Sequence, residues 1–177
     1  MNSAALAGQA RGVAMLAPAV QQRAGGVELE PVVRLREQLS MAVIWVTHDL
    51  GVVAGMTDKI IVMYAGKVFE QAPTRELFRT PANPYTKGLL RSVPDPAHEQ
   101  GKELYQIPGL PPDVAHLPPG CPFAERCERA EEICRREFPP FVQINADHHS
   151  LCHFADEVYA ESVREAKPTA ETPGEIE

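Results

Sequence analysis

The chain has 177 residues, enough for one ordinary domain or for a smaller domain with an appendage. Its net charge is −7, and it lacks the clustered Lys and Arg residues of a nucleic-acid-binding face. The longest apolar run, residues 41–46, is far shorter than the ~20 residues that span a bilayer, and the N-terminus has no long apolar core of a secretory signal. We therefore expect a soluble, intracellular protein with no nucleic-acid partner.

Changes in composition divide the chain into four segments. Residues 1–28 are rich in Ala, Gly and Gln, show no sustained hydrophobic period and are predicted to be disordered. Residues 29–93 combine helix-like and strand-like patterns, as expected for an α/β domain. Residues 94–155 contain all four cysteines and many of the 17 prolines, which indicates an irregular extension. Residues 156–177 are acidic and are predicted to form a disordered tail.

The α/β segment begins with a short helix and a strand. Pro31 suits the first turn of a helix, and Leu35 and Leu39 follow at helical spacing, so we expect a helix that ends near residue 40. Residues 41–47 are apolar on both faces. This pattern is typical of a central parallel strand that is covered by helices on each side.

A β-hairpin is predicted next. Residues 59–64 and 67–71 are rich in β-forming side chains and meet at Ala65 and Gly66. Gly66 readily takes a positive φ, but Ala suits a type I′ turn poorly. We therefore expect another turn type or a bulge.

Two short helices are predicted after the hairpin. Thr74 is the expected N-cap of the first helix. Asn83 is the expected N-cap of the second, and Pro84 is its expected first residue. The apolar side chains of both helices are expected to lie in the core.

His48 is the first candidate site residue, because it follows directly after the predicted strand over residues 41–47. Ligands of open parallel sheets bind beyond the carboxyl ends of the strands, and an imidazole can donate to an anionic oxygen. The alternative is a partly exposed histidine with a structural role only.

The four cysteines form the second candidate site. Their spacing is C-x5-C-x6-C-x17-C, and they are Cys121, Cys127, Cys134 and Cys152. Two disulfides would allow three connectivities but are unusual in a reducing compartment, and zinc sites normally contain a close C-x2–4-C pair. An iron–sulfur cluster accepts thiolates from longer, looped spacings. We favour a metal centre over disulfides, and an iron–sulfur cluster over zinc.

Three histidines lie near the fourth cysteine, namely His148, His149 and His153. One of them is a candidate substitute ligand in a metal centre. Solvent-exposed loop histidines are the favoured interpretation.

Several stretches, taken in order, resemble one known family. They are THDL at residues 47–50, MYAGKVFEQ at 63–71, NPYTKGLL at 83–90 and IPGLPPDVAHLPPGCPFAERC at 107–127. Over residues 30–155 the chain resembles the C-terminal part of the ATP-binding subunit of ABC importers for oligopeptides, dipeptides or nickel. The resemblance implies an α/β fold: part of a P-loop NTPase (ABC ATP-binding) domain, followed by an irregular Cys-rich extension.

The resemblance also implies roles for both candidate sites. His48 falls on the family's switch histidine, which contacts the γ-phosphate of MgATP and helps to place the attacking water. The four cysteines match those of the family's extension, which is associated with a [4Fe-4S] cluster; zinc remains the alternative.

Other motifs of that family are absent from the sequence. It contains no phosphate-binding loop G-x-x-x-x-G-K-[ST], no LSGGQ signature and no apolar strand ending in Asp-Glu. Because the loop's backbone amides and Lys carry most of the phosphate binding, we expect this chain alone to bind ATP weakly or not at all and not to hydrolyse it. The chain is thus predicted to be a fragment, or a truncated product, of a transport-coupled ATP hydrolase.

The implied partners are a second ATP-binding subunit, two transmembrane permease subunits and, indirectly, an external peptide-binding protein. The implied location is the cytoplasmic face of the plasma membrane, through contacts with the permeases. The alternative function is a non-catalytic interaction module that binds an iron–sulfur cluster or another metal through the cysteines.

Overall fold

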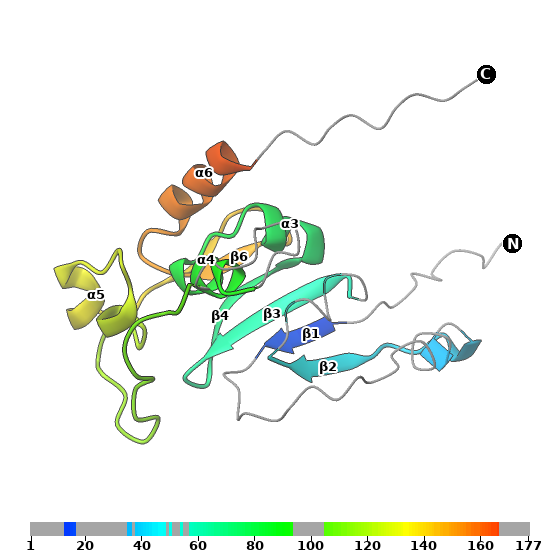
Figure 1. Ribbon diagram of the computed structural model, residues 1–177, viewed down its shortest axis with the longest axis horizontal. Helices are drawn as coiled ribbons and strands as arrows, with labels where there is room; N and C mark the ends of the chain where they lie inside the picture. The colour runs from blue at the N-terminus through cyan, green and yellow to red at the C-terminus, as the bar shows by residue number, and fades with distance from the viewer. Residues whose placement is uncertain are drawn as a thin grey trace, which may run out of the picture.

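The computed structural model describes residues 13–16, 35–36, 38–48, 50, 54, 57–93 and 105–166. Within this part of the chain, the strands form one six-stranded mixed sheet with the order β2-β1-β3-β4-β6-β5 (Figure 1). The fold is therefore α/β, with parallel pairing at one end of the sheet and antiparallel pairing at the other. No helix among the described residues is long and apolar enough to cross a membrane.

The parallel part of the sheet contains a strand that the sequence does not predict. β1 (Val13–Leu16) pairs in parallel with both β2 (Ile44–Thr47) and β3 (Lys59–Tyr64). It lies within residues 1–28, for which the sequence indicates disorder. A strand of four residues has little local periodicity, and its partners are distant in sequence, so local patterns do not reveal it.

β2 differs from the prediction of a central strand that is covered on both faces. It lies at the edge of the sheet, and Ile44 and Val46 are each 69% exposed. Trp45 points to the other face and packs against the core. The apolar pattern shows that both faces are suited to burial, but the described part of the chain covers only one of them.

The predicted hairpin is confirmed, and its turn corrects one expectation. β3 pairs antiparallel with β4 (Lys67–Pro73). Ala65 has a φ of +48° and Gly66 a φ of +74°, so both central residues are left-handed, as in a type I′ turn. The expectation of another turn type was therefore wrong, whereas the alternative, an irregularity such as a bulge, is present as a register shift between Val62 and Met63.

The two helices after the hairpin differ in how their N-termini are capped. α3 (Thr74–Arg79) begins at Thr74 itself, so the predicted N-cap role of Thr74 is wrong; its hydroxyl lies 3.1 Å from that of Thr57. α4 (Pro84–Arg91) has the predicted N-cap, because the side-chain oxygen of Asn83 accepts from the amide of Tyr85 at 3.0 Å.

The Cys-rich extension adds two strands to the same sheet. β6 (His149–Leu151) pairs antiparallel with β4 and with β5 (Phe141–Gln143). α6 (Ala155–Glu165) then runs through much of the segment that the sequence predicts as a disordered tail. Val158 and Ser162 of α6 are buried four residues apart, a periodicity that net charge does not reveal.

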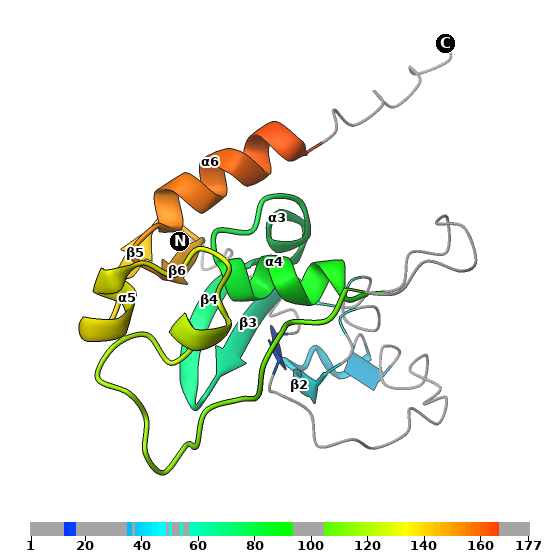
Figure 2. The ribbon, with the colours of Figure 1, turned by 60° about the vertical axis from the view of Figure 1, so that its left-hand side comes forward.

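An aromatic cluster joins the extension to the rest of the fold. Phe123 packs against Tyr64 of β3 and Tyr85 of α4, with ring centroids 5.4 Å and 5.1 Å apart. Phe69 of β4 completes the cluster, and α4 lies across β3 and β4 (Figure 2). Arg126 adds polar contacts, since its guanidinium donates to the Tyr64 hydroxyl at 3.1 Å. The extension and the hairpin therefore share one core.

Candidate functional site

His48 directly follows β2 and is exposed. Because β1, β2 and β3 are parallel, their carboxyl ends lie at one edge of the sheet, where α/β proteins commonly bind ligands. The location agrees with the expected position for a phosphate-contacting histidine. Its contact with ATP remains a prediction.

The four cysteines are brought together in space. All are free thiols, and all line one small pocket whose other walls include Phe123, Leu151 and Phe154. One lies three residues before η1 (Ala124–Arg126), one directly follows η1, one belongs to α5 (Glu132–Arg136), and one lies in the link between β6 and α6. The members are Cys121, Cys127, Cys134 and Cys152. The pocket thus gathers the set that the spacing singled out.

Burial and backbone amides shift the pKa of these thiols in opposite directions. Burial raises the pKa of Cys121 to about 11, although the amides of Phe123 and Ala124 oppose this. Burial likewise raises the pKa of Cys152 to about 12, against the amide of Phe154, which donates to its sulfur at 3.4 Å. A bound cation would have to displace the thiol protons, while the amides already stabilise negative charge on sulfur.

The arrangement of the thiols bears on which metal centre could form. Among the described residues, which include all four cysteines, no group of three or more His, Cys, Asp or Glu side chains is placed to hold a metal ion. A single tetrahedral zinc requires every ligand within about 2.3 Å of one point. The four thiols share one pocket, but within the described residues they are not placed to hold a metal ion, so the metal centre stays a prediction.

The prediction of exposed loop histidines is wrong for His148. This residue is completely buried and lies between two glutamates. His153 lines the thiol pocket, and its ring lies 3.0 Å from the backbone oxygen of Glu137. The alternation of polar and apolar residues in this stretch gives no sign of the buried network, because the glutamates lie more than seventy residues away in sequence.

Comparison with known proteins points to transporter ATP-binding proteins. Residues 69–134 match the profile of a family described as oligopeptide/dipeptide transporter, C-terminal region. A putative peptide import ATP-binding protein of Brucella ovis is 44% identical over 124 residues, which is 67% of this chain and 37% of that protein. The oligopeptide transport ATP-binding protein OppD of Salmonella typhimurium is 48% identical over 118 residues, covering 67% of this chain and 35% of OppD.

The chain matches the C-terminal region of oligopeptide/dipeptide transporter ATP-binding subunits. The family match covers most of β4, the helices α3 and α4, and three of the four cysteines. The chain spans little more than a third of the first relatives, at 37% of the Brucella ovis protein, so it corresponds to a part of such a protein. The resemblance found from the sequence motifs is thereby confirmed.

Proposed function

We propose that this chain forms the C-terminal part of the energy-coupling, ATP-binding subunit of an ABC importer for peptides. The main support for this proposal is the 44–48% sequence identity to peptide import and oligopeptide transport ATP-binding proteins. In this proposal residues 29–93 complete the ATP-binding domain, and residues 94–155 form the extension. The partners are a second ATP-binding subunit, two permease subunits and a peptide-binding protein, at the cytoplasmic face of the membrane.

His48 acts as the switch histidine in this proposal. Its exposed ring at the end of β2 would donate to the γ-phosphate of MgATP and stabilise the charge that develops during hydrolysis. The sequence contains no phosphate-binding loop, so the loop and its Lys must come from another stretch of polypeptide. The chain by itself is therefore not expected to hydrolyse ATP.

Two experiments test this proposal. Calorimetric titration of the chain with MgATP should give no saturable binding, and micromolar affinity would contradict that expectation. A chimera then joins the N-terminal part of the Salmonella typhimurium OppD ahead of residue 41 of this chain. Assembled with the permease subunits, the chimera should hydrolyse ATP in response to peptide.

Variants of the chimera test the role of His48. His48→Ala should lower ATP hydrolysis by about 100-fold or more, because a group that contacts the transferring phosphate is lost. His116→Ala is the matched control, since its side chain is 85% exposed and pairs only with Asp113. Equal activity of the two variants would remove His48 from the mechanism.

We propose as a second function that the thiol pocket holds an iron–sulfur cluster. Four free cysteines line one pocket, and backbone amides point at Cys121, Cys127 and Cys152, which supports a site for anionic sulfur ligands. A bound cluster would connect η1, α5 and the β6–α6 link and would offer one-electron chemistry. Zinc is the alternative occupant.

Anaerobic purification tests the cluster. Stoichiometric iron and sulfide with broad visible absorbance are expected, and Cys127→Ser should lower both contents. Ser92→Ala is a matched control outside the pocket, because its hydroxyl donates only to the backbone of α4. Zinc in place of iron, or four empty thiols, would contradict the cluster.

A further inference from the structure

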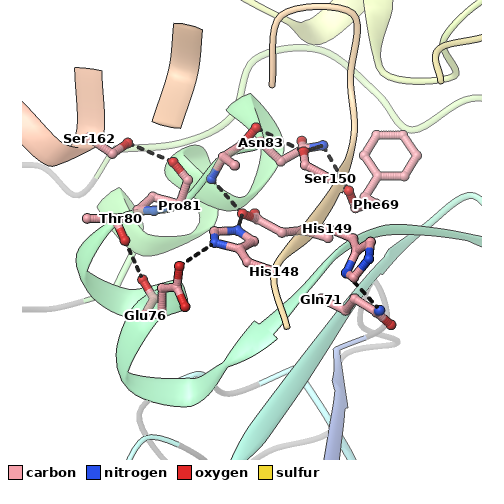
Figure 3. A network of polar contacts seen from close by, with 12 residues as sticks. Phe69, Gln71, Glu76, Thr80, Pro81, Asn83, His148, His149, Ser150 and Ser162 are labelled. Atoms are coloured by element: carbon pink, nitrogen blue, oxygen red, sulfur yellow. Dashed lines mark hydrogen bonds and ion pairs between the residues drawn. The ribbon is translucent and has the colours of Figure 1, made fainter. Parts of the chain in front are cut away.

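A group of three ionisable side chains joins the extension to the hairpin; two of them, Glu70 and His148, are buried, and the side chain of the third, Glu76, is 24% exposed (Figure 3 shows Glu76 and His148). The Nε2 atom of His148 lies 2.7 Å from Glu70 Oε1, and its Nδ1 atom lies 3.0 Å from Glu76 Oε1. Glu70 belongs to β4, Glu76 to α3, and His148 immediately precedes β6. We call these three residues the Glu–His–Glu cluster.

The geometry fixes the number of protons in the cluster. A neutral imidazole has one donor and one acceptor nitrogen, but here both nitrogens face carboxylate oxygens. The contacts are satisfied by an imidazolium between two carboxylates, or by a neutral imidazole with one protonated glutamate. Both arrangements hold the same extra proton and have one net negative charge. Loss of that proton leaves two negative charges and a nitrogen lone pair that faces an oxygen.

The second charge would be costly at this location. His148 and Glu70 are completely buried, and the Oε2 atom of Glu70 has no hydrogen-bond partner within the described structure. The backbone amide of Ala82 donates to Glu70 Oε1 at 2.5 Å, and Asn145 donates to Glu76 Oε1 at 2.6 Å. These donors stabilise one charge on each glutamate but supply no mobile proton.

The other groups around His148 do not replace the proton either. The rings of Tyr159 of α6 and His148 form a T-shaped pair, with their centroids 5.6 Å apart. The neighbouring His149 contacts Gln71 and stacks on Phe141 instead. Burial alone lowers the pKa of His148, but the hydrogen bonds and charges of Glu70 and Glu76 outweigh burial and raise it.

The junction that the cluster supports is otherwise narrow. β6 pairs with β4 at only two register positions, Glu70 with Ser150 and Gln71 with His149. Besides the contact of Gln71 with His149 and the ion pairs of Lys87 with Glu161 and Glu165 of α6, the remaining polar contacts involve no ionisable group. These run from Asn83 to Phe69, Ser150 and Leu151, from Ser150 to Ala82, and from Ser162 to Pro81. Figure 3 shows Asn83 beside Ser150, and Ser162 beside Pro81.

We propose that the Glu–His–Glu cluster is a proton-dependent switch that holds β6 and α6 against β4 and α3 and loosens this contact as the pH rises. Because the folded-state pKa of His148 is raised, the stabilisation is fully present below the free-imidazole value of about 6.5 and is lost as the pH rises through the raised value. The inference does not depend on ATP, metal or transport.

Amide hydrogen exchange on the full chain, from about pH 6 to about pH 9.5 and corrected for intrinsic rates, tests the switch. The amides of residues 149–151 and 155–162 should lose at least about tenfold in protection relative to those of the β3–β4 hairpin. Ring-nitrogen NMR of His148 should show its titration over the same pH range. Protection that falls in parallel for both regions would overturn the proposal.

Variants separate the switch from simple packing. Glu76→Gln keeps the shape but removes one charge, so the loss of protection and the titration of His148 should both move to lower pH. His148→Gln should abolish the pH dependence, while Glu132→Gln, on an exposed side chain of α5, should leave it unchanged. If His148→Gln does not fold, Glu76→Gln decides: a midpoint equal to that of the unaltered chain would refute the switch.

Discussion

The two ends of the described sheet differ in which side chains they bury. At its edge, β2 leaves the apolar side chains of Ile44 and Val46 each 69% exposed. At the β4–β6 junction, the charged side chains of Glu70 and His148 are completely buried. Burial here follows the availability of partners rather than polarity. Most polar groups of the junction are hydrogen-bonded, with Glu70 Oε2 as an exception, whereas no described residue covers the outer face of β2.

Removing the aromatic contact between the extension and the hairpin is expected to change the free energy of unfolding most. Phe123→Ala should lower the free energy of unfolding by about 3–5 kcal/mol, because Phe123 is 4% exposed and packs on two other rings. Urea unfolding monitored by circular dichroism measures this loss. Phe138→Ala, at a side chain that is 47% exposed, is the control and should cost less than about 1 kcal/mol. Equal losses would show that the extension does not share the core.

Substitutions of Asn83 test the polar contacts at the β4–β6 junction. Asn83→Ala should cost about 2–3 kcal/mol, because it removes the cap of α4 and leaves the backbone oxygens of Phe69 and Leu151 without this donor. Asn83→Ser retains a cap acceptor and should recover about 1 kcal/mol of that loss. No recovery would indicate that the amide contacts alone account for the effect. Thermal unfolding of both variants provides the comparison.

The pH dependence of global stability gives a smaller effect. Relative to His148→Gln, the unaltered chain should lose on the order of 1 kcal/mol of unfolding free energy between about pH 6.5 and about pH 9. The sign follows from the raised pKa of His148, since the folded chain binds a proton that the unfolded chain has already released. Parallel stability curves for the two proteins would contradict this.

Local patterns in the sequence predicted the elements that depend on local chemistry. The hairpin follows from two β-rich runs around Gly66, and the start of α4 follows from Asn83 and Pro84, whose cap is formed within three residues. β1 and the edge position of β2 depend on pairing between distant segments, so neither could be read from a local window. α6 was not predicted, because the acidic composition of this segment indicated disorder although Val158 and Ser162 are buried.

The candidate sites also differ in whether their residues lie close together in the sequence. The clustering of the cysteines within a short window indicated a common site, and the structure places all four around one pocket. His148 offered no comparable signal, because its significance comes from Glu70 and Glu76, more than seventy residues earlier. A buried histidine between two carboxylates can be found only once the sheet pairing is known.

The exposed face of β2 provides the smallest expected change in stability and the sharpest test of the contrast. Replacing both Ile44 and Val46 by Thr keeps β-branched side chains but makes the face polar. Because these side chains are already exposed to water, the free energy of unfolding should change by no more than about 0.5 kcal/mol. Self-association, measured by light scattering at rising concentration, should decrease.

Val62→Thr on β3 is the matched control, because the same kind of change there places a hydroxyl at a completely buried position. It should cost about 1–3 kcal/mol. If the β2 substitutions cost as much as Val62→Thr, the outer face of β2 must be covered in solution. In that case the edge strand would bury its apolar side chains after all, and the difference between the two ends of the sheet would disappear.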